Sequence, residues 1–457
     1  MIPTDTMSSS CAPLRAPTPP TACGRGRTPT ETPTETPTKT AIETATDMLR
    51  PSRPGAAGAP QPAELIRARI AVSLVFLANG LGMANLVPRY PEIVADLGLS
   101  KASFGQAVAA ASVGALVAGL IASRLITRLT SARVASLGMV IISAALAGAG
   151  LAGSWAWLAV CLLIVGGTDA VVDVAQNAHG LRVQRRWGSS IVSSFHAAWS
   201  LGTVLGAIMG QAAAGAGLGP GPHMGLTALV LVLLSAVPLA LGWFLPGPDA
   251  QDRPALTEPD HAAASGPAAP RAARTVLTGL ILAVVGLLCA AAMVPEDVAQ
   301  NWSSLLLSDQ GAPAGQVGLG IVSLQGTMIL GRLLGDRVVD ALGPRAVIAG
   351  GGLLVVAGMG AALALSSVLG TLIGMAISGL GCAVAVPVTY SAADDIPGLA
   401  PGLGLTIVSW LARLAGLVAP PVVGWLSDSH GQWVALAYGL IGGLVLATCW
   451  PVLRRRG

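Results

Sequence analysis

The chain has 457 residues, of which 53% are hydrophobic and 11% are charged, and its formal net charge is +4. Soluble domains carry about 25% charged residues, so this composition excludes an ordinary water-soluble protein. Apolar runs of roughly 20 residues recur along the chain, which is the length that a helix needs to cross a bilayer. The short alternating strands of a membrane barrel are not seen. The sequence therefore predicts a polytopic all-α membrane protein.

The chain begins with a segment, 1–63, that is rich in Thr, Pro, Ala and Gly. It has too little apolar surface to fold, so we expect a disordered tail. The alternative is that the start is mis-assigned and that translation begins at Met48. A polar stretch at 247–274 is predicted to be a cytoplasmic linker between two six-helix halves, 64–246 and 275–457. The twelve expected spans lie at about 68–88, 104–126, 134–153, 156–179, 191–212, 224–245, 276–304, 315–335, 346–366, 369–391, 402–424 and 432–452.

Basic residues indicate the orientation of these spans. Loops on one side offer only Arg89 and Lys101. Loops on the other side, together with the end of the chain, contain Arg124, Arg128, Arg133, Arg182, Arg185, Arg186, Arg332, Arg337, Arg345, Arg454, Arg455 and Arg456. Cytoplasmic loops carry the excess of Lys and Arg, so both termini are expected to be cytoplasmic.

The two halves also repeat a pattern of small and basic residues around their second and third spans. Residues of the first half recur in the second half at constant spacing: Gly114, Gly119, Arg133 and Gly138 correspond to Gly326, Gly331, Arg345 and Gly350. Internal repeats of this kind are typical of secondary transporters, whose substrate site lies between the halves near the membrane midplane.

Five segments carry a family resemblance that extends from about residue 75 to 428. Residues 331–345, GRLLGDRVVDALGPR, resemble the loop signature of the major facilitator superfamily. Residues 173–177, DVAQN, look like a fourth-helix pattern of fucose-permease-like members. Residues 193–200 and 296–302 are similar to an adjacent subgroup of bacterial permeases, and 416–428 resembles the eleventh helix of that set. The resemblance implies a twelve-helix transporter with two pseudo-symmetric halves in the bacterial inner membrane.

The sequence departs from the family's pattern at three places. Ser123 stands where the first copy of the loop signature has an acidic residue. Fucose permeases carry an acidic residue in the first helix, where this chain offers Asn79 and Asn85. Asn301 replaces the subgroup's acidic residue just before Trp302. The identity of the substrate is therefore not inferred for this chain from these members of the family.

Carboxylates inside apolar spans are the candidates for proton coupling. Asp169 and Asp173 lie one helical turn apart in the fourth span, and carboxylates in hydrocarbon usually face a bundle interior or a water-filled path. Asp173 is the first candidate because it matches the family pattern, and Asp169 could share its proton. Glu296, late in the seventh span, is the third. The alternatives are structural aspartates bonded to neighbouring helices and, for Glu296, a solvated helix end.

Polar and aromatic residues on several spans are candidates for solute binding, because sugar sites combine aromatic platforms with amides and charged groups. An intramembrane arginine needs a partner, so Arg413 is also expected to bridge the halves through Asp169 or Asp173. The other reading of His196 is a helix–helix contact. The predicted substrate-binding residues are Asn79, Asn85, Asn177, His196, Trp199, Asn301, Trp302, Gln325 and Arg413.

Charged residues of the loop signature, Asp336, Arg337 and Arg345, are predicted to gate the cytoplasmic side, with a plain topology signal as the alternative for Arg345. The absence of a Walker motif disfavours ATP drive, and no CxxC pair indicates zinc. We therefore expect a proton-coupled transporter of a small polar, sugar-like solute. It should be a monomer in the bacterial plasma membrane with no enzyme activity, cofactor, metal or nucleic-acid partner.

Two other functions remain as alternatives. One is efflux of amphipathic compounds, which would need a wide apolar cavity. The other is a membrane sensor that transports nothing. An intramembrane aspartyl protease is disfavoured, because its two carboxylates must face each other from separate helices and Asp169 and Asp173 share one helix.

Overall fold

The computed structural model describes residues 62–189, 191–247, 249, 271–394, 396, 399 and 403–452. The predicted tail lies outside the described residues except for its last two, and so does most of the predicted linker. Twelve stretches of the described chain are helical, long and apolar enough to cross a membrane. This confirms the prediction of a twelve-span all-α membrane protein.

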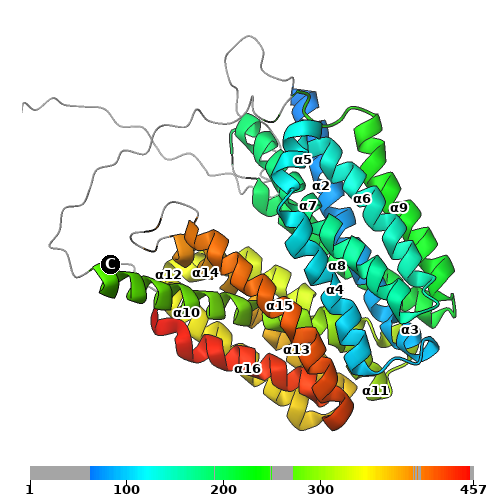
Figure 1. Cartoon of the computed structure of the whole chain (residues 1–457), viewed down its shortest axis with the longest axis vertical. Helices are drawn as coiled ribbons and strands as arrows, with labels where there is room; N and C mark the ends of the chain where they lie inside the picture. The colour runs from blue at the N-terminus through cyan, green and yellow to red at the C-terminus, as the bar shows by residue number, and fades with distance from the viewer. Residues whose placement is uncertain are drawn as a thin grey trace, which may run out of the picture. The chain divides into compact units, whose positions relative to one another are not determined.

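In the first half, the spans are built from six long helices with shorter helices between them (Figure 1). Their bounds are α2 (Pro62–Leu86), η1 (Val87–Arg89), α3 (Tyr90–Asp96), α4 (Lys101–Gly119), α5 (Ala122–Leu129), α6 (Ser131–Gly150), α7 (Trp155–Trp187), α8 (Val192–Gly215) and α9 (Pro220–Ala240).

The second half contains α10 (Arg271–Asp297), η3 (Val298–Trp302), α11 (Ser303–Asp309), η4 (Ala314–Gln316), α12 (Leu319–Leu365), α13 (Val368–Cys382), α14 (Ala385–Asp394), α15 (Leu403–His430), α16 (Trp433–Cys449) and η5 (Trp450–Val452). Helix α12 includes the eighth and ninth spans. Gly343 has a φ of 79° there, and Pro344 follows it. The glycine allows a left-handed turn, so the two spans meet in a tight corner instead of a loop.

Serine residues fix the start of three spans. The side chains of Ser100, Ser154 and Ser367 each accept a hydrogen bond from a backbone N–H three residues further on. Such N-caps satisfy amide groups that the first turn of a helix leaves without partners. The seventh span differs, because five of its residues, Val298–Trp302, form a π-helix between α10 and α11. π-Helical turns occur frequently at functional sites.

The closest approach of the two halves is between α4 and α15, which we call the α4–α15 contact. A side chain at Gly105 would collide with the backbone of Pro420, and one at Gly424 with the carbonyl of Lys101. The hydroxyl of Ser112 donates to the carbonyl oxygen of Gly416 over 3.1 Å. Small residues let membrane helices approach closely.

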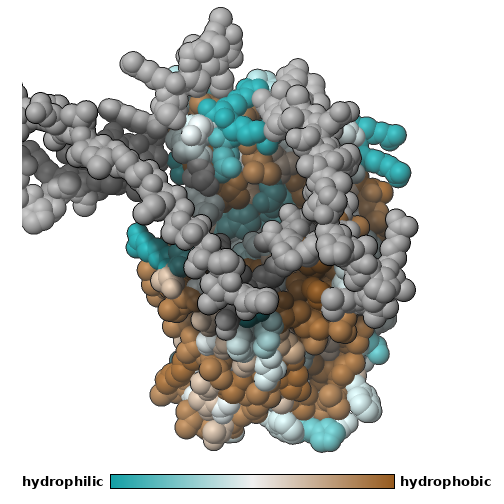
Figure 2. Space-filling view, turned by 90° about the vertical axis from the view of Figure 1, so that its left-hand side faces the viewer, coloured by the Kyte–Doolittle hydropathy of each residue, from teal (hydrophilic) through white to brown (hydrophobic). Residues whose placement is uncertain are grey.

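Hydrophobic side chains cover much of the face in Figure 2, as a lipid-facing surface requires.

Candidate functional site

Three helices of the first half meet at a polar cluster of Asn79, Asp169 and Trp199, which we call the first-half cluster. The amide nitrogen of Asn79 on α2 donates to Oδ1 of Asp169 on α7 over 2.5 Å. The indole N–H of Trp199 on α8 donates to Oδ1 of Asn79 over 2.8 Å. Asn79 therefore connects the tryptophan to the carboxylate, and its amide orientation is fixed from both sides.

Asp173 lies one turn further along α7 in a different environment. Its side chain is exposed. Oδ1 of Asp173 accepts from the amide of Asn177 over 3.0 Å and from that of Gln176 over 3.5 Å. These partners belong to the same helix, whereas the partner of Asp169 comes from another helix. The sequence pattern favoured Asp173, but the contacts between helices are made by Asp169.

Arg413 on α15 faces the first-half cluster from the second half. Its positive charge interacts electrostatically with Asp169, which also interacts with Asp173. Arg413 interacts with Tyr390 on α14 as well. Within the described chain, Arg413 forms no ion pair with either aspartate. The predicted bridge is therefore not closed in this conformation, although Arg413 lies within electrostatic reach of Asp169.

A second polar cluster, the second-half cluster, is formed by Glu296, Gln300 and Gln325. Oε1 of Glu296 accepts from the amide of Gln325 on α12 over 2.7 Å and from that of Gln300 over 3.3 Å. Gln325 is fully buried, and its Oε1 has no hydrogen-bond partner. A buried acceptor of this kind is costly unless another donor reaches it.

Arg332 on α12 connects the two halves near both clusters. Its Nη1 donates to the hydroxyl of Ser200, the residue after Trp199, over 3.2 Å. Its Nε donates to the carbonyl of Ala383 over 3.4 Å. The sequence analysis treated Arg332 only as a topology signal, although an arginine within an apolar span was a clue to more.

Several predicted substrate-binding residues lie outside these clusters, and three of them have other partners. Asn85 is fully buried inside the first half, and its Oδ1 pairs with Nε2 of His223 over 3.1 Å. Asn301 donates to Asp297 over 2.7 Å and does not contact Glu296. Trp302 is fully buried against the ring of Phe104, with 5.9 Å between ring centroids. In this conformation, Trp302 packs α4 against the seventh span.

The remaining predicted residues are less connected. His196 is exposed, with its ring 5.4 Å from that of Phe76. Arg337 is exposed, and the side chain of Asp336 lies outside what the structure describes. Arg345 donates to the carbonyl of Pro451 over 3.0 Å and lies over the ring of Trp450. Arg345 therefore ties the ninth span to the twelfth within the second half.

One end of the α4–α15 contact is closed by charges that the sequence analysis did not single out. The carboxylate of Asp428 accepts from the backbone N–H groups of Lys101 and Ala102 over 2.7 and 2.8 Å. These amides form the N-terminus of α4, where the helix dipole favours a negative charge. The ammonium of Lys101 pairs with Asp309 at 2.9 Å. In the sequence, the only indication of a role for Asp428 was its position at the end of the family-like segment 416–428.

Replacing Asp428 with Asn should weaken this closure, because the neutral amide loses the attraction to the helix N-terminus. We expect the ratio of closed to open molecules to fall roughly fivefold, in line with a cap contribution of about 1 kcal/mol. A disulfide between Ser112→Cys and Gly416→Cys measures it, since a Cβ at 416 would lie 3.9 Å from Oγ of Ser112. Asp96→Asn, at an exposed site on α3, is the matched control. Equal cross-linking in both variants would contradict the role of Asp428.

At the other end of the first half, a buried charged cluster holds the segment after α9, which we call the α9 clasp. Asp249 accepts from the backbone N–H of Ser131 over 2.7 Å, and Oδ1 pairs with Nη1 of Arg182 at 3.2 Å. Nδ1 of His179 lies 2.8 Å from the hydroxyl of Ser131. The backbone N–H of Leu245 donates to Nε2 of His179 over 3.2 Å. The clasp therefore binds the segment after α9 to α6 and α7.

Comparison with known proteins identifies relatives over most of the chain. The sequence model of the family described as Major Facilitator Superfamily matches residues 72–303 and 301–457. An uncharacterized MFS-type transporter of Yersinia pestis is 26% identical over 383 residues, covering 83% of this chain and 94% of the relative. The crystal structure of the nucleoside transporter NupG superposes with a TM-score of 0.62 at 14% identity, over 85% of this chain and 98% of its own. For the D-xylose-proton symporter, the TM-score is 0.63 at 15% identity, over 84% and 97%.

Proposed function

The chain belongs to the major facilitator superfamily and is a multi-pass transporter of the bacterial inner membrane, and we propose that it moves a small polar solute by proton-coupled alternating access. The observation that carries this proposal is the first-half cluster. A carboxyl group, an amide and an indole from three helices converge there, opposite an arginine of the second half.

Asp169 supplies the coupling in this proposal. When Asp169 is ionised, it attracts Arg413 and can draw the two halves together. When it is protonated, that attraction is lost, and only the hydrogen bond to Asn79 remains. The proton and the conformational change are linked because the charge of Asp169 has different partners in the two states. Arg413 is the group that Asp169 attracts when it is ionised. The predicted bridge between the halves therefore forms and breaks as Asp169 loses and gains its proton.

The groups that surround the site support a polar solute. Asn79 and Trp199 from the first half, with Glu296 and Gln325 from the second, provide amide, indole and carboxylate groups for hydroxyls. The unpartnered Oε1 of Gln325 accepts one of these hydroxyls in the proposal. The relatives of known structure are named for a nucleoside and for D-xylose, both of which contain a sugar ring. A sugar-like solute is therefore favoured over an amphipathic one.

The orientation of the chain follows from its arginines. The side of the membrane with Arg124, Arg128 and Arg185 is cytoplasmic by the positive-inside rule. The closure by Asp428 and Lys101 then lies on the opposite side of the membrane.

Proteoliposomes with a pH-sensitive dye inside test this function. Pentoses, hexoses, polyols and nucleosides are added in turn, with protein-free liposomes as the control. We expect one class of solute to produce a protein-dependent pH change in the lumen. Solute uptake without any proton movement would overturn the coupling. Transport of amphipathic dyes, with none of the polar solutes moving, would overturn the substrate class.

A further inference from the structure

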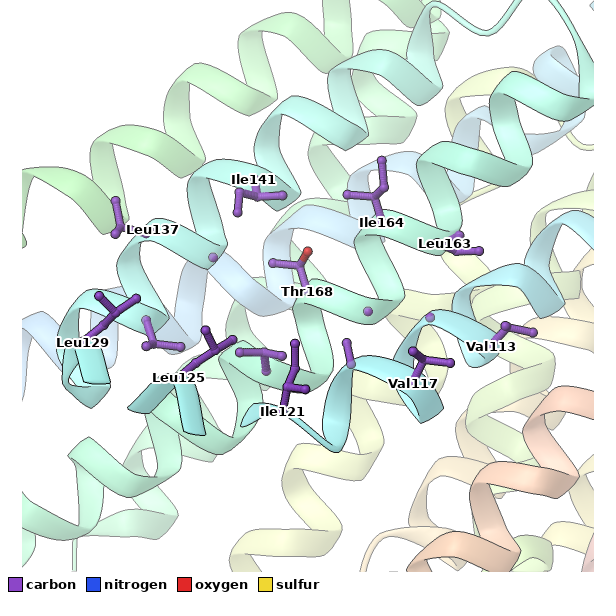
Figure 3. Close-up of a pocket in the computed structure, with 16 residues that line it drawn as sticks. Val113, Val117, Ile121, Leu125, Leu129, Leu137, Ile141, Leu163, Ile164 and Thr168 are labelled. Atoms are coloured by element: carbon purple, nitrogen blue, oxygen red, sulfur yellow. The ribbon is translucent and has the colours of Figure 1, made fainter. Parts of the chain in front are cut away.

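A hydrophobic groove lies on the first half, between α4, α5, α6 and α7 (Figure 3). Its volume is about 610 Å³, and the hydroxyl of Thr168 is its one polar side-chain group. Val117, Leu137 and Ile141 on its walls are exposed. Val117 lies about 140° around α4 from Ser112, which contacts α15, at 3.6 residues per turn. The groove therefore opens away from the second half and toward lipid.

Helix α5 crosses one end of this groove and carries two adjacent stripes of side chains, one of leucines and one of arginines. Leu125 and Leu129, four residues apart, line the groove, and Figure 3 shows them beside Ile121. Arg124 and Arg128 have the same spacing and precede the leucines by one residue, so they form the adjacent stripe. Both arginines are exposed. Neither forms an ion pair with any residue that the structure describes.

The position of α5 is fixed by its packing. Ala122 and Ile126 are buried, with 1% and 5% of their surface exposed. Thr130, which joins α5 to α6, has a φ of 80°. A β-branched residue rarely adopts this conformation, so the surrounding packing must hold it there. The two stripes are therefore presented at the end of the groove in a fixed orientation.

We propose that the groove and the arginine stripe of α5 bind a phospholipid with an anionic headgroup. An acyl chain lies in the groove, and the headgroup lies against Arg124 and Arg128. Any lipid can fill the apolar part, but only an anionic headgroup supplies net negative charge to the two guanidinium groups. Basic residues on the cytoplasmic side of membrane helices recognise anionic lipids in this way. Their long side chains keep the charge at headgroup level.

Native mass spectrometry of the full chain, reconstituted in an equal mixture of phosphatidylglycerol and phosphatidylcholine, tests the site. We expect the wild-type protein to retain phosphatidylglycerol over phosphatidylcholine by roughly tenfold. The double variant Arg124→Gln/Arg128→Gln should lose this preference. The matched control, Arg185→Gln/Arg337→Gln, removes two exposed arginines from elsewhere on the same side and should keep it.

A second pair of variants separates the groove from the charge. Val117→Trp fills the groove, so retention of both lipids should fall, while Leu226→Trp on the exposed face of α9 should change nothing. Gel filtration identifies any variant that fails to fold. The proposal is overturned if the wild type shows no preference, if both arginine pairs reduce it equally, or if folded Val117→Trp retains lipid as the wild type does.

Discussion

Replacing Asp169 with Asn is expected to abolish proton-driven accumulation of the solute while facilitated exchange continues. Asn cannot take up a proton, although it keeps a similar shape and can still bond to Asn79. With one proton per solute, a gradient of one pH unit supports up to about tenfold accumulation, and the variant should reach a ratio of about one. Uptake of labelled solute into proteoliposomes with and without a pH gradient measures both quantities.

Asp173→Asn is the matched control for this experiment. The two aspartates lie on the same helix, one turn apart, and the substitution makes the same chemical change. Because the hydrogen bonds of Asp173 come from its own helix, we expect gradient-driven accumulation to persist in this variant. If Asp173→Asn abolishes accumulation and Asp169→Asn does not, the assignment is reversed, and the prediction from the family pattern was the better guide.

Replacing Asp249 with Ala is expected to destabilise the protein strongly. The change removes the carboxylate that pairs with Arg182, whose side chain is 1% exposed. Removing one member of a buried ion pair costs about 3–5 kcal/mol. The substitution also removes the acceptor for the backbone N–H of Ser131. The midpoint of thermal unfolding in detergent should fall by several degrees.

The control for the α9 clasp is Asp96→Ala, which removes an exposed carboxylate from α3. Surface substitutions of this kind usually change the free energy of unfolding by less than about 0.5 kcal/mol. Equal unfolding midpoints for the two variants would show that the clasp contributes nothing to stability. The double variant Arg182→Ala/Asp249→Ala should lose less than the sum of the two single substitutions, because both remove the same ion pair.

The fold could be predicted from sequence because each span is a long apolar run and lipid leaves a helix few alternatives. Local departures from regular α-helical spans could not be predicted in this way. From the sequence, Gly343 and Pro344 are expected in a loop between two spans, but they form a corner within α12. The π-helical turn at Val298–Trp302 follows Pro295, but a proline alone does not specify it. Such details depend on which neighbour a helix packs against, and hydropathy does not encode this.

The site was predictable as a set of residues but not as a set of contacts. Asn79, Asp169 and Trp199 were each found as polar or aromatic residues in apolar spans. Their meeting depends on the packing of three helices that are far apart in sequence. The same information was missing for Asn85, whose partner His223 lies within the first half. His179 was an overlooked signal for the α9 clasp, since a histidine in an apolar span needs a partner as much as an aspartate does.

The bond between Asp428 and the start of α4 has a consequence for how this chain can vary. Its donors are main-chain groups, so substitutions at Lys101 and Ala102, apart from proline, leave both hydrogen bonds available. The acceptor is a single side chain, and every change at position 428 alters it. Across related sequences, position 428 should therefore be constrained without a covarying partner. Methods that infer contacts from paired changes would therefore overlook this contact between the two halves.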